Sequence, residues 1–312
     1  MAHRIVITEF MDLPAVEQLR AKYDVLFAPD FVKQRTELLV AVKDIPALIV
    51  RNLTQVNQEL LDAAPKLKVV GRLGVGLDNI DLVACEKRGV KVIPAAGANA
   101  LSVAEYTVTT AMIMLRTAYY STAAVAAGEW PKPVLGRGRE IAGKTLGVIG
   151  YGFIGRLSTR LAQALGMQVI ASDPYVPADD PIWKATNVRR VGLDELLGAA
   201  DVVTLHIPLQ ESTRNLMSAA NIAKMKKGSA LINTSRGGII DEHALAAALK
   251  EGRLCGAALD VFEHEPLADT PHLKNVPNLI LTPHVAGITA EANARVSTMI
   301  ADEITAFLEQ HG

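Results

Sequence analysis

Three short motifs, each at the end of an apolar run, carry residue types suited to proton transfer and anion binding. They are NTSRGG at 233–238, LDVFEHEP at 259–266 and LTPHVAG at 281–287, which contain Arg236, Glu265 and His284. An arginine can bind a carboxylate, and a histidine can donate or accept a proton near neutral pH. A neighbouring glutamate stabilises imidazolium and raises the histidine pKa. The three side chains together would suit the reduction of a keto acid or the oxidation of a hydroxy acid.

Two alternatives to this set remain open from position alone. His206 also ends an apolar run, DVVTLH, so it could be the acid–base residue instead. A metal site could be built from His206, Asp260, Glu265 and His284, but no close ligand spacing supports one and we expect no metal. Cys85 and Cys255 are far apart and form no CxxC motif, so we interpret both as thiols in a reducing compartment.

A glycine-rich motif, GYGFIG, follows the apolar run TLGVI and precedes a predicted helix. Gly150 permits a tight turn, Gly152 lets a phosphate approach, and Gly155 lets helix and strand pack closely. Phe153 and Ile154 complete the motif at the helix start, where N–H groups and the helix dipole favour a pyrophosphate. The motif therefore predicts a dinucleotide site.

The choice of dinucleotide depends on Asp173, which ends the next predicted strand, MQVIAS, and can bind ribose hydroxyls. A carboxylate there repels a 2′-phosphate, so we expect NAD rather than NADP. Arg189 and Arg190 could change this preference, but we interpret them as a solvated surface pair.

The elements that must position these residues alternate between short β-branched runs and helical patterns along the whole chain. A first series uses runs at 5–8, 47–50, 68–71 and 90–93, and a second series begins at KTLGVIG. This βαβ rhythm predicts two doubly wound parallel-sheet domains. We expect a substrate domain of 1–99 plus 288–312 and an NAD-binding domain of 100–287. We also expect one long helix over 100–127, and a helix over 289–309 that packs on the first domain.

Composition excludes several classes of partner. The 312 residues carry a formal charge of −1 and half are hydrophobic, so no strong positive field invites nucleic acid. No apolar run reaches the roughly 20 residues that cross a bilayer, and we expect no membrane partner. The apolar stretch at the start contains Glu9 and Asp12 and does not resemble a signal peptide, which favours the cytoplasm.

The motifs together resemble those of the D-isomer-specific 2-hydroxyacid dehydrogenase family. The resemblance lies in GYGFIG with Asp173, INTSRGGIID, AALDVFEHEPL and LTPHVAG, and in the first half in KVVGRLGVGLDNID and NALSVAEY. It implies a Rossmann NAD domain with a smaller flavodoxin-like substrate domain. The implied reaction is the NAD-dependent interconversion of a small D-type 2-hydroxy acid and its 2-keto acid. An NAD-sensing binding protein without turnover is the alternative from another functional class.

The resemblance also implies residue roles. Arg236 would bind the substrate carboxylate and carbonyl, and His284, paired with Glu265, would donate the proton in reduction. Asp260 would contact the nicotinamide amide. Further cofactor residues would be His206, Pro208, Thr213, Thr234, Ser235 and Gly287. The backbone of Leu73, Gly74, Val75 and Gly76 would hold the substrate carboxylate, because N–H groups in a glycine-containing turn can form an anion nest.

Three basic residues bear on the substrate and the assembly. Arg51 and Arg72 lie in RNLT and GRLG, which resemble segments with substrate-facing cations in phosphoglycerate dehydrogenases, so a second anionic group, as in phosphoglycerate or sulfolactate, is expected. Surface salt bridges are the alternative for both. Lys132 sits where similar enzymes place a basic residue that reaches the neighbouring subunit, although the local sequence differs. The resemblance implies a homodimer built through the cofactor domain.

Overall fold

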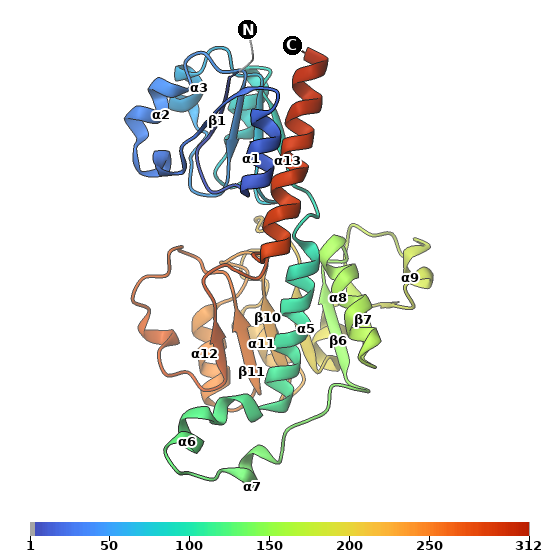
Figure 1. The fold of residues 1–312 in the computed structure, drawn as a ribbon. Helices are drawn as coiled ribbons and strands as arrows, with labels where there is room; N and C mark the ends of the chain where they lie inside the picture. Colours follow the sequence, from blue (N-terminus) through green and yellow to red (C-terminus); the bar gives the residue numbers. More distant parts are fainter. Residues whose placement is uncertain (1–3, 312) are drawn as a thin grey trace. The chain divides into compact units, whose positions relative to one another are not determined.

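The computed structural model describes residues 4–311 and separates the chain into two compact units. The first holds the chain up to Asn99 together with the segment from Ile288 onward, and the second is Ala100–Gly287. Each unit is built on its own parallel sheet with helices on both faces (Figure 1), which confirms the expected fold class.

The first unit has five parallel strands in the order β2-β1-β3-β4-β5. The strands are β1 Arg4–Ile7, β2 Asp24–Phe27, β3 Ala47–Val50, β4 Val69–Arg72 and β5 Lys91–Pro94. Because side chains alternate along a strand, Ile5 and Ile7 enter the core under α1 and α13, whereas Val6 enters the core under α2, α3 and α4. These helices are α1 Leu13–Arg20, α2 Arg35–Ala41, α3 Gln58–Ala63, α4 Leu82–Lys87 and α13 Ala290–His311. Helix α13 packs on α1 and on β4, as expected for the last helix.

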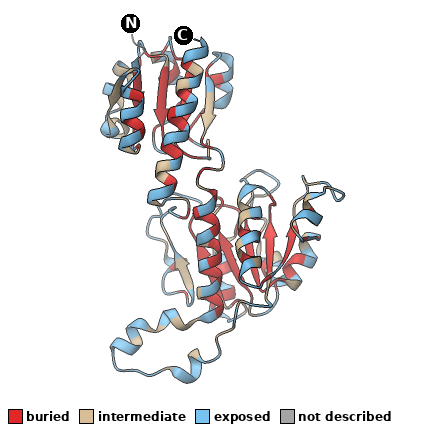
Figure 2. Cartoon of the chain, turned by 45° about the vertical axis from the view of Figure 1, so that its right-hand side comes forward, coloured by how far each residue is buried: buried red, intermediate tan, exposed pale blue. Residues whose placement is uncertain are grey.

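The second unit has seven parallel strands in the order β12-β11-β10-β9-β6-β7-β8. They are β6 Thr145–Ile149, β7 Gln168–Ser172, β8 Arg189–Arg190, β9 Val202–Leu205, β10 Ala230–Asn233, β11 Gly256–Leu259 and β12 Leu279–Leu281. Figure 2 shows the central strands buried. This order is that of a Rossmann sheet extended by a strand, and it reverses between β6 and β9.

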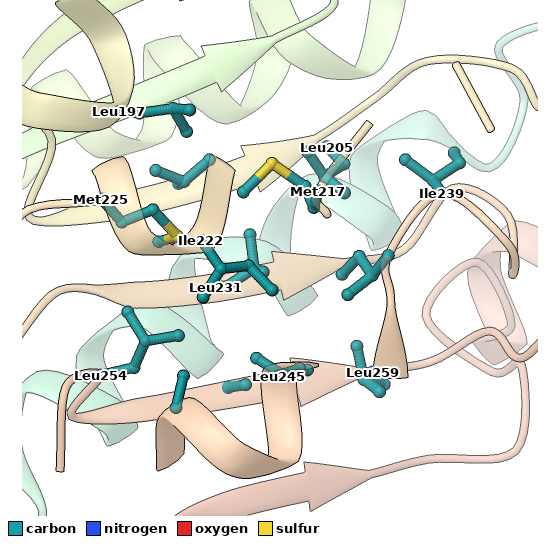
Figure 3. Close-up of a cluster of buried hydrophobic side chains, with 14 of the residues drawn as sticks. Leu197, Leu205, Met217, Ile222, Met225, Leu231, Ile239, Leu245, Leu254 and Leu259 are labelled. Atoms are coloured by element: carbon teal, nitrogen blue, oxygen red, sulfur yellow. The ribbon is translucent and has the colours of Figure 1, made fainter. Parts of the chain in front are cut away.

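Helices cover both faces of this second sheet. Helices α5 Ala100–Arg116 and α8 Phe153–Ala164 pack together on one face. The other face is covered by α10 Leu193–Ala199, α11 Ala219–Lys224 and α12 Glu242–Lys250, and Figure 3 shows the aliphatic core beneath them. Short helices α6 Thr122–Ala126, α7 Lys132–Leu135 and α9 Ile182–Ala185 lie in the connections.

The expected helix over 100–127 is wrong in length. Helix α5 ends at Arg116 because Thr117 adopts a left-handed conformation, with φ of 58° and ψ of −15°, which a continuous right-handed helix cannot include. The chain continues as a 3₁₀ turn, Ala118–Ser121, followed by α6. Apolar periodicity carries no signal for such a break, since apolar residues continue on both sides of it.

Candidate active site

The glycine motif and His206 meet where the order of the second sheet reverses. Gly150 follows β6 and His206 follows β9, and the His206 N–H donates to the Ile149 carbonyl at 2.8 Å. Gly150 has a φ of 92°, and a Cβ atom there would lie 2.4 Å from the His206 carbonyl oxygen. Only glycine fits this turn, so the two strand ends approach closely at the point where open α/β sheets bind ligands.

The other two glycines of the motif have different surroundings. A Cβ atom on Gly155 would lie 2.3 Å from the Gly150 carbonyl oxygen, whereas one on Gly152 would meet nothing within 4 Å. Gly152 is also the N-cap of α8, and no side chain in the described part of the chain caps that helix. The first N–H groups of α8 are therefore suited to a phosphate acceptor, as the sequence predicts.

Asp173 closes this loop from the neighbouring strand. Its carboxylate accepts from the Tyr151 N–H at 2.7 Å and from the Tyr175 N–H at 2.8 Å. Each oxygen has further acceptor capacity, so ribose hydroxyls can still be bound. Arg189 forms an ion pair with Glu195, in agreement with the surface interpretation of Arg189 and Arg190.

Two buried polar atoms near this edge of the sheet have no hydrogen-bond partner within residues 4–311. They are Nδ1 of His206 and Oγ1 of Thr234. Because buried polar groups in folded proteins are nearly always paired, these two atoms fit a polar cofactor group bound beside them. Together with the open cradle at Gly152, they show that the residues suit a dinucleotide.

The surroundings of His206 argue against an acid–base role. Its Nε2 atom lies 3.1 Å from Thr204 Oγ1 and 3.5 Å from Ser158 Oγ. Desolvation of the ring lowers the pKa of His206 to about 3, so the imidazole is neutral near pH 7 and carries no proton to donate to a ketone. The choice between His206 and His284, which position alone left open, therefore favours His284.

Other predicted cofactor residues shape the loops around the site. Thr213 Oγ1 donates to the Pro208 carbonyl at 2.7 Å and accepts from the Gln210 N–H at 2.8 Å. The Ser235 hydroxyl donates to the Leu205 carbonyl at 2.5 Å. Gly287 follows the buried residue Ala286, directly after the His284 turn.

The turn that carries Arg236 depends on Asn233, which the sequence reasoning did not select. Asn233 ends β10 and is 1% exposed; its side-chain oxygen accepts from the Ser235 N–H and its amide donates to the Arg236 carbonyl, at 3.0 and 2.8 Å. The Arg236 guanidinium donates to the Ser235 carbonyl at 2.7 Å. A Cβ atom on Gly237 would lie 1.9 Å from the Phe262 carbonyl carbon, so this turn lies directly against the loop that contains Glu265.

Glu265 and His284 form a hydrogen-bonded pair. Nδ1 of His284 lies 2.7 Å from Glu265 Oε2, and the other carboxylate oxygen accepts from the Phe262 N–H at 3.0 Å. The His284 side chain is half exposed, and its backbone is left-handed with a φ of 56°. With Nδ1 bound to Glu265, Nε2 is the ring atom left for proton exchange with a substrate.

In the first unit, Arg51 is held by a residue that the sequence reasoning passed over. The buried carboxylate of Glu9, after β1, accepts the N–H groups of Arg51, Asn52, Leu53 and Thr54, at 2.8, 3.2, 3.0 and 2.9 Å. This loop follows β3 and Glu9 follows β1. Glu9 therefore lies where the strand order of the first sheet reverses, between β1 and β3. The sequence signal that could have selected Glu9 is a carboxylate directly after a predicted strand.

The Arg51 side chain itself is oriented by two neighbours. Its Nη2 atom donates to Asn293 Oδ1 at 3.0 Å, and its guanidinium carbon lies 5.6 Å from the centre of the Phe10 ring. Burial lowers the pKa of Arg51, while the charge of Glu9 raises it. The guanidinium remains a cation at neutral pH.

The predicted anion nest over Leu73–Gly76 needs a correction. The Leu73 N–H donates to the Val50 carbonyl and the Gly74 N–H to the Arg72 carbonyl, both at 2.8 Å, so neither is available to a ligand. Val75 and Gly76 remain as candidate donors. The Leu73 N–H is occupied because β3 and β4 are neighbours in the sheet and Leu73 extends the hydrogen bonds between them. The same pairing brings Arg51 and Arg72 to one edge of the sheet.

Residues 4–311 contain no group of three His, Cys, Asp or Glu side chains that could hold a metal ion. No helix in this range is long and apolar enough to span a membrane.

Comparison with known proteins places this geometry in a family. Residues 108–286 match the model described as "D-isomer specific 2-hydroxyacid dehydrogenase, NAD binding domain". The (S)-sulfolactate dehydrogenase of Chromohalobacter salexigens is 51% identical over 96% of both chains. A D-3-phosphoglycerate dehydrogenase of Methanocaldococcus jannaschii is 41% identical over 96% of this chain and 56% of its own. The solved TT0316 protein of Thermus thermophilus has a TM-score of 0.87 and 32% identity, over 98% of this chain and 97% of that one.

The chain belongs to the D-isomer-specific 2-hydroxyacid dehydrogenase family. It is an NAD-dependent oxidoreductase that interconverts a 2-hydroxy acid and its 2-keto acid.

Proposed function

We propose that this dehydrogenase acts on a D-type three-carbon 2-hydroxy acid with a second anionic group at C3, and that this group is a sulfonate. The observation that carries the proposal is Arg51, a half-buried cation whose side chain and loop are both fixed by neighbours. A fixed guanidinium is suited to a tetrahedral oxyanion. The nearly full-length match to a protein named (S)-sulfolactate dehydrogenase supports a sulfonate over a phosphate. In sulfolactate the carbon that bears sulfur takes priority over the carboxyl carbon. The descriptor S therefore denotes the D-type arrangement.

We propose the following roles for the reacting residues of the second unit. Arg236 binds the carboxylate, and His284 donates a proton from Nε2 to the carbonyl oxygen. Glu265, bound to Nδ1, holds the ring and stabilises imidazolium. Bound NADH supplies the hydride that C2 receives. In the oxidation direction, neutral His284 takes up the hydroxyl proton.

The test is NADH consumption with a panel of keto acids. We expect kcat/KM to be highest for sulfopyruvate, lower for 3-phosphohydroxypyruvate, and lower again for hydroxypyruvate and pyruvate, which lack the second anion. A preference for hydroxypyruvate or pyruvate would overturn the assignment of the second anion. NADH binding without turnover of any keto acid would instead support the alternative of an NAD-sensing binding protein.

The role of Arg51 is tested separately. Loss of a charge-assisted contact costs about 2–3 kcal/mol, so Arg51→Leu should lower kcat/KM for sulfopyruvate about 30- to 150-fold and change that for pyruvate little. Arg4→Leu, an exposed arginine of the same unit, is the matched control. An equal loss for both substrates would show that Arg51 supports the fold rather than the second anion.

We infer a homodimer from the arm formed by residues 117–138, which Figure 1 shows as a loop with α6 and α7. The structure describes all of these residues and none is buried, although Tyr119, Trp130 and Val134 are large and apolar. Such a segment is typical of an interface. Trp130→Ser with Val134→Ser should yield monomers in sedimentation, and Lys132→Ala tests the basic residue. A monomeric wild type at micromolar concentration would contradict the inference.

We infer a cytoplasmic location because both cysteines are free and far apart, which suits a reducing compartment that contains NAD. Fractionation of cells that produce the native protein tests this inference.

A further inference from the structure

The turn that carries His284 is held from beneath by Asp260. This carboxylate is 1% exposed and accepts the Val285 and Ala286 N–H groups, each at 2.8 Å, and the Thr282 hydroxyl at 2.6 Å. The bonds therefore fix the backbone on both sides of His284. Because a non-glycine residue adopts a φ near 56° only at a cost, the conformation of His284 requires such support.

Tyr106, on α5, extends this arrangement by one more hydroxyl. Its oxygen lies 2.7 Å from Thr282 Oγ1. The direction of the bond follows from the chemistry, because Thr282 has one hydroxyl hydrogen and donates it to Asp260. Thr282 must then accept from Tyr106. The order of donation is Tyr106 to Thr282 to Asp260, with the two backbone N–H groups meeting the same carboxylate.

We propose that Tyr106 and Thr282 are positioning residues for His284. They orient the Asp260 carboxylate, which fixes the left-handed turn and thereby the direction of the imidazole. Both act through Asp260 and not by contact with the reacting atoms. The proposal rests on the proposed role of His284 as proton donor, and it adds a hydrogen-bonded chain that begins on a helix remote in sequence.

The hydrogen bonds from Tyr106 to Thr282 to Asp260 should persist over the usual pH range. Burial raises the pKa of Tyr106, and the charge of Asp260 raises it further. The phenol therefore stays protonated and continues to donate well above neutral pH.

The test uses Tyr106→Phe and Thr282→Val, with Thr282→Ser as the conservative variant that keeps the hydroxyl. Small misplacement of a catalytic group is costly, so each of the first two variants should lower kcat about 10- to 100-fold. We expect Thr282→Ser to retain most activity, and NADH affinity by fluorescence titration to change less than about threefold in all variants. Thr107→Val is the matched control, because its buried hydroxyl donates to the Val103 carbonyl of the same helix and bonds to no other residue in the range 4–311.

Two further readouts separate positioning from general stability. Hydrogen exchange at Val285 and Ala286 should accelerate in Thr282→Val but not in Thr107→Val. The double variant Tyr106→Phe with Thr282→Val should have the kcat of Thr282→Val alone, because the effect of Tyr106 passes through Thr282.

Unchanged kcat in Tyr106→Phe and Thr282→Val, in an enzyme whose wild type and control are active, would overturn the positioning role. So would equal losses in Thr107→Val, or strictly additive effects in the double variant. If instead the wild type turns over no keto acid, or His284→Ala keeps full activity, the proposed function itself fails. The two failures are thus distinguishable.

Discussion

The imidazole of His284 lies 2.7 Å from the carboxylate of Glu265, and the second carboxylate oxygen is bound to a backbone N–H of its own loop. Glu265 is therefore fixed at both oxygens and fixes His284 in turn. General acid catalysis contributes about 10²- to 10⁴-fold, so His284→Ala should lower kcat by that factor while NADH affinity stays nearly constant.

A change of Glu265 should lower kcat less than the loss of His284 does. Glu265→Gln keeps a hydrogen bond to Nδ1 but removes the charge that favours imidazolium, so we expect kcat to fall about 10- to 100-fold. His311→Ala, a surface histidine that bonds to the Phe307 carbonyl, is the control in the same steady-state assay. Normal activity of either site variant would refute the assignment.

His206 should make the protein sensitive to mild acid. Its folded pKa of about 3 lies below the ordinary value of 6.5, so the unfolded chain binds the extra proton and stability is lost as the pH falls from 6.5 towards 3. At pH 4 the loss amounts to about 3 kcal/mol. Chemical denaturation of wild type and His206→Asn at pH 7 and pH 4 measures it, and the variant should lose that much less. Parallel losses in both proteins would show that His206 does not titrate as inferred.

Asp173 should control the choice between NADH and NADPH. Asp173→Asn keeps an acceptor for a neighbouring N–H but removes the charge that repels a 2′-phosphate, which at a partly exposed site amounts to about 1–2 kcal/mol. The ratio of kcat/KM for NADH to that for NADPH should fall about tenfold. Asp179→Asn, an exposed aspartate of the same loop, should leave the ratio unchanged. A wild type that uses both cofactors equally would contradict this role.

Glu9 should support both the fold of the first unit and the substrate site. Glu9→Gln leaves buried N–H groups of the loop 51–54 without good acceptors, at a cost of about 1–3 kcal/mol in the free energy of unfolding. We expect a lower denaturation midpoint and a higher KM for the dianionic keto acid, because the loop carries Arg51. Glu17→Gln, exposed on α1, is the control. Unchanged KM with reduced stability would limit Glu9 to a structural role.

The sequence by itself determined the two-sheet α/β architecture, the cofactor loop and the edge of the sheet at which Arg236, Glu265 and His284 lie. These features follow from local patterns, because an apolar run predicts a buried strand and its polar end must lie at the carboxyl edge of a parallel sheet.

Only the tertiary structure decided the remaining features. It favoured His284 over His206 as the acid–base residue, because desolvation depends on what surrounds a side chain and not on its place in a motif. It revealed the contacts of Glu9 and Tyr106 because their partners are remote in the sequence. It revealed those of Asn233 because a side-chain bond within a turn depends on the backbone conformation of that turn. It also ended α5 at Arg116 and withdrew two N–H groups from the predicted anion nest, since backbone conformation and strand pairing are set by packing across the sheet.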